Sequence, residues 1–254
     1  MTFSTRLDAL PRHERPTSEL STVHALPTVV FISCYEVGAS RRFSALMPRL
    51  GERLARVDGV VGIGNAHRAA ASMSRTSMFY VVDGDNEVSD SFAFDFVPEV
   101  HQRSYTHVWH SKNPCIDITY GHGGVKLFPR SSVLAYSGSD LDFSTSVSAG
   151  LIVHPEVVSV EHFNESPLSA FISAFRESVK LTIINDEVSL SRLAAWKAPR
   201  PDSLNARFVK KGADMGQLFA NYHCDNPSQL ALINDYEFLS CVFEDRFPPT
   251  SSPL

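Results

Sequence analysis

Three short apolar runs in the first third of the chain predict buried β-strands, because each is rich in β-branched or aromatic residues. They cover residues 28–34, 57–63 and 78–82. Two segments between them predict helices: residues 39–56, whose apolar side chains recur every three or four positions, and the alanine-rich residues 64–73. This order of strand, helix, strand, helix, strand predicts a parallel sheet with right-handed crossovers.

Further along the chain the pattern becomes more varied. Residues 91–97 alternate Phe92, Phe94 and Phe96 with smaller or acidic residues, which predicts a strand with one buried face. Additional strands are expected at residues 106–110, 125–128, 151–153 and 157–160. The serine- and aspartate-rich stretch from 131 to 150 predicts a surface loop or mobile lid.

The C-terminal third has a helical pattern. Ser166 and Pro167 suit the cap and first position of a helix, and apolar residues from Leu168 to Val179 then fall on one face. Residues 189–196 predict a second helix, and residues 205–247 an α-rich tail with an elbow at 212–216. Pro48, inside the first predicted helix, is expected to kink or break it. The predicted fold is α/β, a mainly parallel, Rossmann-like sheet flanked by helices, with an α-rich C-terminal part.

Composition excludes several classes of protein. The 254 residues are 43% hydrophobic and 20% charged, which is ordinary globular composition, and no apolar run approaches the roughly 20 residues that span a bilayer. The net charge of −5 argues against general polyanion binding, so a nucleic-acid partner would need a local basic patch. Four widely spaced cysteines without a C-x-x-C pair argue against a zinc ribbon or a thioredoxin-type site. We expect reduced thiols and a cytoplasmic location.

The strongest chemical signal is Asp83-Gly84-Asp85, directly after the buried run at 78–82. Open α/β sheets bind ligands at the carboxyl ends of their strands. Two carboxylates there, separated by a glycine that permits close approach, suit a divalent cation such as Mn²⁺ or Mg²⁺ and its usual partner, a diphosphate. The alternative interpretation is an ordinary polar turn after a strand.

Three enzyme classes place such an acidic pair after a buried strand. Haloacid-dehalogenase phosphatases prefer it on the first strand followed by Gly-Thr, whereas here Asn86-Glu87 follow the third predicted strand. Nucleotidyltransferases usually carry a Gly/Arg/Lys-rich loop after the first strand, where this chain has residues 33–36, Ser-Cys-Tyr-Glu. The order of elements agrees with the third class, sugar-nucleotide glycosyltransferases of the GT-A fold.

The resemblance to GT-A glycosyltransferases rests on the strand end Cys34-Tyr35-Glu36, an Asn-led alanine-rich helix, and the apolar strand into Asp-x-Asp. More narrowly, the chain resembles small phage-type glycosyltransferases over residues 28–247. The matching segments are residues 60–63, 66–67, 78–86, 107–109, 113–114, 120–129 and 175–181. The resemblance implies transfer of a sugar from a nucleotide sugar, UDP-linked in our interpretation, to hydroxymethylcytosine in double-stranded phage DNA. It also implies the host cytoplasm if the chain is phage-encoded.

The resulting division of the chain has three parts. Residues 1–26 are polar, carry three arginines and lack the apolar core of a secretory signal, so we expect a loosely ordered leader. Residues 27–247 form a single GT-A-like domain, with a nucleotide-binding half at 27–100 and an acceptor half at 101–247. Residues 248–254 are expected to be a flexible tail.

Predicted donor-binding residues cluster at the ends of the first three strands and on the helix after Pro167. Tyr35 and Glu36 are assigned to base and ribose, and His67 to the phosphates. Asp83 and Asp85 are also metal ligands, with His223 as the third, although His154 and His162 are equally available. The complete donor set is Ser33, Tyr35, Glu36, Asn65, His67, Asp83, Gly84, Asp85, Arg176 and Lys180.

An acceptor hydroxyl needs a carboxylate within reach, and Glu177, Glu161 and Asp117 are the candidates for base or nucleophile. The glycine-rich stretch beside Tyr120 predicts a loop facing the acceptor or donor sugar, or alternatively a tight turn between strands. Its residues are Tyr120, Gly121, His122, Gly123, Gly124 and Lys126. Candidate DNA contacts are Lys112, Lys126, Arg130, Lys210 and Lys211.

Other functions remain open at this stage. A glycosyltransferase of the same fold acts equally well on a polysaccharide, lipid or protein. A metal-dependent nucleotidyltransferase or phosphatase uses similar carboxylates, and a nucleotide-binding module without catalysis uses a similar crevice.

Overall fold

The computed structural model describes residues 26–138 and 141–248, and in them seven strands form one mixed sheet in the order β2-β1-β3-β6-β5-β7-β4. Strands β1, β2, β3, β5 and β7 run in one direction, whereas β4 and β6 run in the other. The prediction of a mainly parallel α/β sheet is confirmed. The strands are β1 (Thr28–Ser33), β2 (Leu54–Asp58), β3 (Met78–Asp83), β4 (Asn86–Val88), β5 (Thr106–Asn113), β6 (Ile118–Pro129) and β7 (Leu151–Glu161).

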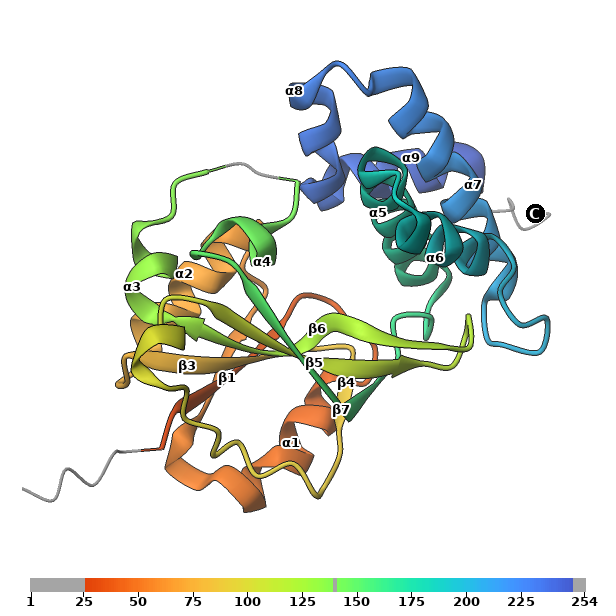
Figure 1. Ribbon diagram of the computed structural model, residues 1–254. Helices are drawn as coiled ribbons and strands as arrows, with labels where there is room; N and C mark the ends of the chain where they lie inside the picture. The colour runs from red at the N-terminus through yellow and green to blue at the C-terminus, as the bar shows by residue number, and fades with distance from the viewer. Residues whose placement is uncertain (1–25, 139–140, 249–254) are drawn as a thin grey trace, which may run out of the picture.

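Helices cover both faces of the sheet (Figure 1). On one face α1 (Ala39–Leu50) packs against β1 and β3 through Leu46 and Leu50. On the other face lie α2 (Ile63–Met73), α3 (Arg130–Ala135) and α4 (Phe143–Ser146), whose apolar side chains surround Phe79 and Phe128. Short 3₁₀ turns follow α1 at Gly51–Arg53 and precede β5 at Val100–Gln102.

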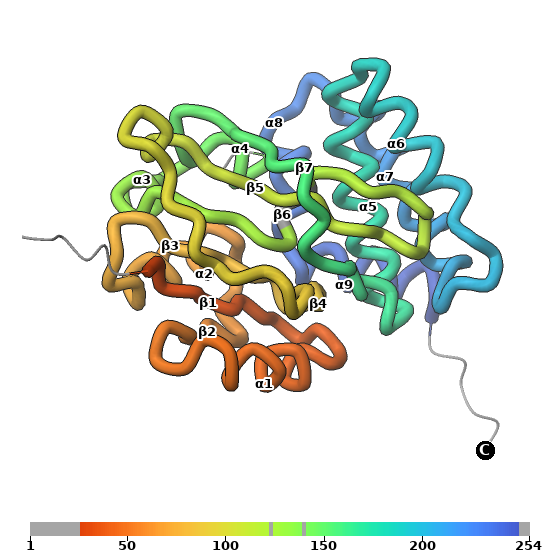
Figure 2. The backbone as a smooth tube through the Cα atoms, turned by 60° about the horizontal axis from the view of Figure 1, so that its bottom comes forward, coloured from red at the N-terminus to blue at the C-terminus, as the bar shows by residue number. Residues whose placement is uncertain are grey.

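The C-terminal part is helical, as predicted, and has its own core around Phe171, Phe175 and Trp196. Ser166 accepts a hydrogen bond from the backbone N–H of Ser169, and Pro167 occupies the first helical position, which confirms the predicted start of the long helix. Figure 2 shows these helices gathered at one end of the strands, beside the β5–β6 hairpin. The elements are α5 (Pro167–Ile184), α6 (Glu187–Lys197), α7 (Ala206–His223), α8 (Pro227–Leu230), the 3₁₀ turn Ala231–Asn234 and α9 (Tyr236–Arg246).

The strand predicted at residues 91–97 is wrong. Phe92 and Phe94 are buried against Tyr80, so the alternating pattern reports a buried face correctly. The backbone carbonyls of Phe92 and Phe94, however, accept hydrogen bonds from the side chains of Arg49 and Arg53. Because these contacts and the positive φ of Phe94 replace a strand ladder, the segment crosses the sheet as irregular structure.

The glycine-rich loop predicted beside Tyr120 is also wrong, since these residues lie within β6. A Cβ at Gly121 would lie 2.6 Å from Val153 Cγ1, and one at Gly124 would lie 1.9 Å from Asn86 Oδ1. The glycines therefore permit close packing across the sheet. The His122 side chain and the surroundings of Gly123 lie outside the described part of the structure, as do residues 1–25 and 249–254, so the predicted leader and tail are not described.

Three smaller predictions need correction. Helix α1 continues past Pro48 and ends at Leu50, short of the predicted residue 56. The stretch predicted as a loop or lid contains the short helices α3 and α4. The predicted elbow at residues 212–216 lies inside α7, where Gly212 and Gly216 face the backbone of α5.

Candidate functional site

Three carboxylates meet at the carboxyl ends of β1 and β3. Asp83 is the last residue of β3 and pairs in register with Ile32 of β1, while Glu36 follows β1 in the loop to α1. Burial raises the pKa of Glu36, and the negative charges of Asp85 and Asp83 raise it further. Asp83 and Asp85 are thus near enough to act on the charge of Glu36, and the three residues are called the acidic cluster below.

Gly84 allows the acidic cluster to form. A Cβ at this position would lie 2.9 Å from Ser33 Cβ and 3.0 Å from Glu36 Oε2, closer than real side chains tolerate. The buried guanidinium of Arg42 holds the turn in place by donating from Nε to the Gly84 carbonyl at 2.8 Å, and it also pairs with Glu165 at 3.0 Å. The sequence does not predict this role of Arg42, because its local pattern contains no sign of a contact with Gly84 or Glu165.

Lys126 provides a positive charge at the edge of the acidic cluster. Its Nζ lies 2.7 Å from Asp83 Oδ2, and the residue is 5% exposed. Lys126 belongs to β6, which pairs directly with β3, so the pair is fixed by strand register. Lys126, predicted as an acceptor-binding residue and a DNA contact, is therefore buried beside the acidic cluster.

Tyr35 stands at the rim of the site in a conformation unusual for its residue type. Its φ is +71°, in the left-handed region, and its side chain is 83% exposed. A strained, exposed aromatic residue beside carboxylates is a ready stacking surface for a planar ring. Ser33 differs: it is 2% exposed, donates to Asp58 Oδ1 at 2.5 Å and accepts from Arg56, so its hydroxyl is engaged within the protein.

The C-terminal helices form the opposite wall. Arg176 of α5 donates to the Ile233 carbonyl at 2.9 Å and to the Tyr236 hydroxyl at 2.9 Å, which joins α5 to α9. Arg176 lowers the pKa of Tyr236, but burial and the charges of Glu36, Asp85 and Asp83 outweigh it and raise that pKa. Tyr236 is therefore close enough to the acidic cluster for its charges to act on the hydroxyl, to which Arg176 is hydrogen-bonded.

A chain of charged groups continues along this wall. Lys180 Nζ lies 2.8 Å from Asp142 Oδ2 and 3.7 Å from Glu177 Oε2. Burial alone raises the pKa of Asp142, but Lys180 outweighs it and holds that pKa well below its usual range. Glu177 also pairs with Arg192, whose guanidinium lies 4.1 Å from the centre of the Tyr120 ring. The chain connects α4, α5, α6 and β6.

Two of the three predicted catalytic carboxylates lie near one another. Glu161, at the end of β7, is 3% exposed and accepts a hydrogen bond from Asn113 Nδ2 at 3.0 Å. Burial raises the pKa of Tyr120 well above its usual value, and the charges of Glu161 and Glu177 raise it further, which places that ring near both. Asp117 is separate: it lies exposed in the β5–β6 turn, on the side of Arg200.

His67 is buried, 3% exposed, between α2 and the sheet. Its Nδ1 donates to the Ile63 carbonyl at 2.8 Å, and its ring packs in a tilted arrangement against Phe143 with centroids 4.3 Å apart. Burial first, and then the charge of Lys126, lower the pKa of His67 to about 4. The histidine is therefore neutral at physiological pH and supplies no positive charge to a phosphate.

We predict that His67 makes stability depend on pH. The unfolded histidine binds its proton near pH 6.5 and the folded one near pH 4, so the unfolded state binds more protons in that window and stability falls as pH falls. A shift of this size corresponds to about 3 kcal/mol. In His67→Phe the loss of stability between pH 6.5 and 4 should shrink by up to this amount, measured by urea unfolding at several pH values. An unchanged pH slope would contradict the buried neutral histidine.

Asn65 lies near the beginning of α2 and is exposed. Its Nδ2 donates to the Val61 carbonyl at 3.1 Å, and its Oδ1 accepts from Arg68 at 2.8 Å. Asn65 lines a pocket of about 230 Å³ together with Tyr136, Phe143 and Asn234. The pocket joins α2 to the 3₁₀ turn before α9, so it borders the same C-terminal wall as Arg176.

The described residues contain no group of three or more His, Cys, Asp and Glu side chains arranged to hold a metal ion. His223, the predicted third ligand, ends α7 and packs against Phe219 with ring centroids 4.6 Å apart. His154 packs against Trp109. Asp83 and Asp85 nevertheless fit Mg²⁺ or Mn²⁺, which are commonly held by one or two carboxylates together with substrate phosphates and water.

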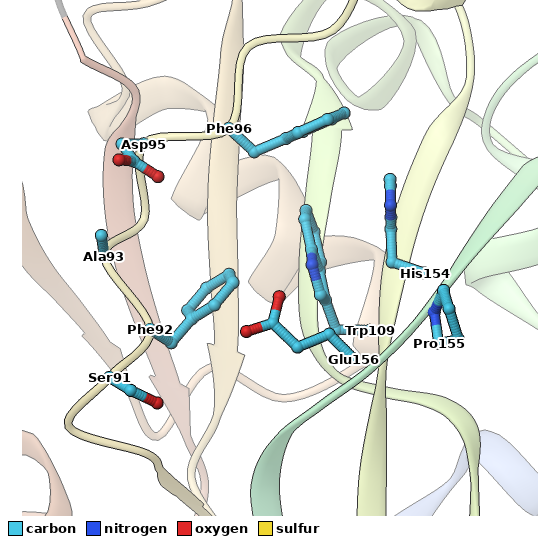
Figure 3. A pocket seen from close by; sticks show the side chains of 9 residues that line it. All are labelled: Ser91, Phe92, Ala93, Asp95, Phe96, Trp109, His154, Pro155 and Glu156. Carbon is cyan, nitrogen blue, oxygen red and sulfur yellow. The ribbon is translucent and has the colours of Figure 1, made fainter.

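A larger cavity of about 470 Å³ lies on another part of the sheet (Figure 3). Aromatic side chains and the carboxylate of Glu156 line it, and the predicted site residues take no part in it, apart from the alternative ligand His154. Figure 3 shows Phe92 and Phe96 on the irregular segment facing Trp109 and His154 on the strands.

Comparisons with known proteins find similar solved structures at low sequence identity. The chain matches no family model, and no curated protein matches it. HddC from Yersinia pseudotuberculosis is similar over 53% of this chain and 72% of its own, with 12% identity and a TM-score of 0.35. A glycosyltransferase involved in the glycosylation of the major capsid of PBCV-1 is similar over 55% of this chain and 95% of its own, with the same identity and TM-score. Scores of this size assign neither a shared fold nor a shared activity.

Proposed function

We propose that this chain is a metal-dependent glycosyltransferase that moves a sugar from a nucleotide-sugar donor to an acceptor hydroxyl. The observation that carries the proposal is the acidic cluster of Glu36, Asp83 and Asp85 at the carboxyl ends of parallel strands, beside the exposed Tyr35. Crevices at this edge bind ligands in open α/β sheets. An exposed aromatic ring and paired carboxylates suit the base and the metal-bound diphosphate of one nucleotide sugar.

In this proposal Asp85 and Asp83 hold Mn²⁺ or Mg²⁺. When bound, the ion would neutralise negative charge on the diphosphate leaving group. Tyr35 stacks on the base, with a uridine nucleotide as the first donor to test, and Glu36 binds the ribose hydroxyls. Lys126 fixes the orientation of Asp83 through their 2.7 Å contact.

We propose Glu161 as the residue that takes the proton from the acceptor hydroxyl. The acceptor oxygen then forms a bond to the anomeric carbon, and the bond to the nucleoside diphosphate breaks. Glu161 lies at the carboxyl end of β7 and pairs in register with Asn86, the residue after Asp85. Glu177 is less suitable because Arg192 and Lys180 already pair with its carboxylate. Asp117 is exposed in the hairpin turn, where Arg200 is a charged neighbour.

For the acceptor we propose hydroxymethylcytosine in double-stranded DNA, which the sequence resemblance to phage-type enzymes supports. A protein of net charge −5 needs a local basic surface for this role, and Lys112 and Arg130 remain candidates. Lys210 and Lys211 lie in α7, where Lys210 pairs with Asp214 at 3.1 Å. Among the described residues no helix has the length and hydropathy to cross a membrane.

A product screen tests the proposal. The full chain is incubated with Mn²⁺, a panel of nucleotide sugars, and duplex DNA with or without hydroxymethylcytosine. We expect release of nucleoside diphosphate that depends on the metal and on the hydroxymethyl group. Equal release with plain DNA or without DNA would overturn the DNA acceptor. Pyrophosphate release would indicate nucleotidyl transfer, and binding without either product would indicate a nucleotide-binding module.

A further inference from the structure

Asn86 follows the acidic cluster directly and is almost completely buried, with 2% exposure. Its Nδ2 donates to Asp85 Oδ1 at 2.8 Å. Its Oδ1 lies 3.2 Å from Ser111 Oγ and 3.0 Å from Ser159 Oγ, and both serines are also buried. The side chain therefore connects a carboxylate at the surface of the site to two hydroxyl groups inside the sheet.

These neighbours fix the orientation of the amide. Ser111 and Ser159 come from β5 and β7, and both hydroxyls can donate a proton to Oδ1. The reversed amide would place its oxygen against the Asp85 carboxylate, where two acceptors would repel each other. Nδ2 must consequently point to Asp85, and rotation of the amide costs hydrogen bonds at both ends.

The backbone of β6 packs directly against the Asn86 side chain. A Cβ at Gly124 would lie 1.9 Å from Asn86 Oδ1 and 2.3 Å from its Cγ, so any larger residue at 124 would displace the amide. This contact explains why position 124, within the Tyr120–Lys126 stretch, is occupied by glycine. Strands β4, β5, β6 and β7 all contribute to holding one side chain.

We propose that Asn86 is a positioning residue that fixes the Asp85 carboxylate for the metal-bound diphosphate, an inference that rests on the proposed function. A hydrogen-bond donor behind a metal-binding carboxylate restricts the rotamers of that carboxylate and raises the affinity of the site for the metal ion. Ser111, Ser159 and Gly124 act through Asn86. The ligand class is a divalent cation coordinated by carboxylate oxygen.

Asn86→Ala tests the proposal, because alanine removes the donor while Ser111 retains the Ser159 carbonyl as an acceptor. We expect Mn²⁺ affinity, measured by electron paramagnetic resonance without donor, to fall about tenfold or more. In turnover assays the Mn²⁺ concentration for half-maximal rate should rise by a similar factor, and saturating Mn²⁺ should restore most of kcat. A merely structural residue would instead lower kcat at every Mn²⁺ concentration.

Asn113→Ala is the matched control. Asn113 is also fully buried and also donates Nδ2 to a carboxylate, but its partner is Glu161. This variant should lose comparable thermal stability and keep Mn²⁺ affinity within about twofold of the wild type. Equal losses of affinity in both variants, or unchanged affinity in Asn86→Ala, would overturn the proposal.

Two further measurements distinguish misfolding of the variant from loss of Mn²⁺ affinity, and the role of Asn86 from the glycosyltransferase proposal. If Asn86→Ala does not fold, the double variant Ser111→Ala/Ser159→Ala releases the amide without altering Asn86, and the same loss of Mn²⁺ affinity is expected. If the wild-type chain binds Mn²⁺ but turns over no nucleotide sugar, the glycosyltransferase proposal fails while the role of Asn86 is still decided by the binding data.

Discussion

Asp85→Ala is expected to lower Mn²⁺-dependent release of nucleoside diphosphate by about 10²–10³-fold, the usual effect of removing one preorganised electrostatic group from a transition state. Asp85 stands beside Glu36 and Asp83, and alanine removes one of the two carboxylates proposed to hold the metal. The melting temperature should fall only modestly, because alanine leaves the buried Asn86 amide without its acceptor but also relieves repulsion of Glu36. Turnover at saturating donor and thermal unfolding of the same preparation measure both effects.

Asp90→Ala is the control for loss of a carboxylate in the same part of the chain. The Asp90 side chain is fully exposed and pairs with Arg49 at 3.5 Å, so turnover should stay within about twofold of the wild type. Normal activity in Asp85→Ala would remove the basis for the metal assignment. A large fall in melting temperature would indicate that Asp85 acts on the fold rather than on the donor.

The sequence predicts the sheet well where burial and backbone pairing coincide. Residues of β1 and β3 are buried on both faces, and their unbroken apolar runs identify them. The segment with Phe92 and Phe94 has a buried face without a strand ladder, and a hydrophobic pattern reports burial alone. Three glycines in four residues predict a loop whose backbone lies close to another group, whereas in strand β6 Gly124 and Gly121 make room for Asn86 and Val153.

In the site, too, the sequence predicts residues that are close along the chain or on neighbouring strands, but not residues brought near by tertiary folding. Asp83, Gly84 and Asp85 are adjacent in sequence, and Glu36 follows the neighbouring strand, so strand order alone brings them together. Arg42 contacts the Gly84 carbonyl, and Tyr236 lies within range of the charges of the acidic cluster, through tertiary folding that no local pattern contains. Their residue types gave no signal, since an arginine on an amphipathic helix and a tyrosine near a helix start are ordinary.

Gly212→Ala and Gly216→Ala are expected to have the largest effect on stability. Added Cβ atoms would lie 2.3 Å from the carbonyl oxygens of Phe171 and Phe175, respectively. These oxygens belong to the backbone of α5, which cannot move aside as a flexible side chain does. Helices α5 and α7 would have to separate, and overpacking of this kind costs about 1–3 kcal/mol per site.

Gly64→Ala separates this packing effect from helix propensity. Gly64 also lies in a helix, but a Cβ there has no atom within 4 Å, so alanine should stabilise α2 by up to about 1 kcal/mol. Opposite signs at Gly64 and Gly212, measured as urea midpoints, would show that the helices meet backbone to backbone. Because Arg176 lies on α5 and contacts Tyr236 of α9, separation of α5 from α7 should also move this wall of the site. Stabilisation of the chain by Gly212→Ala would contradict the close α5–α7 contact.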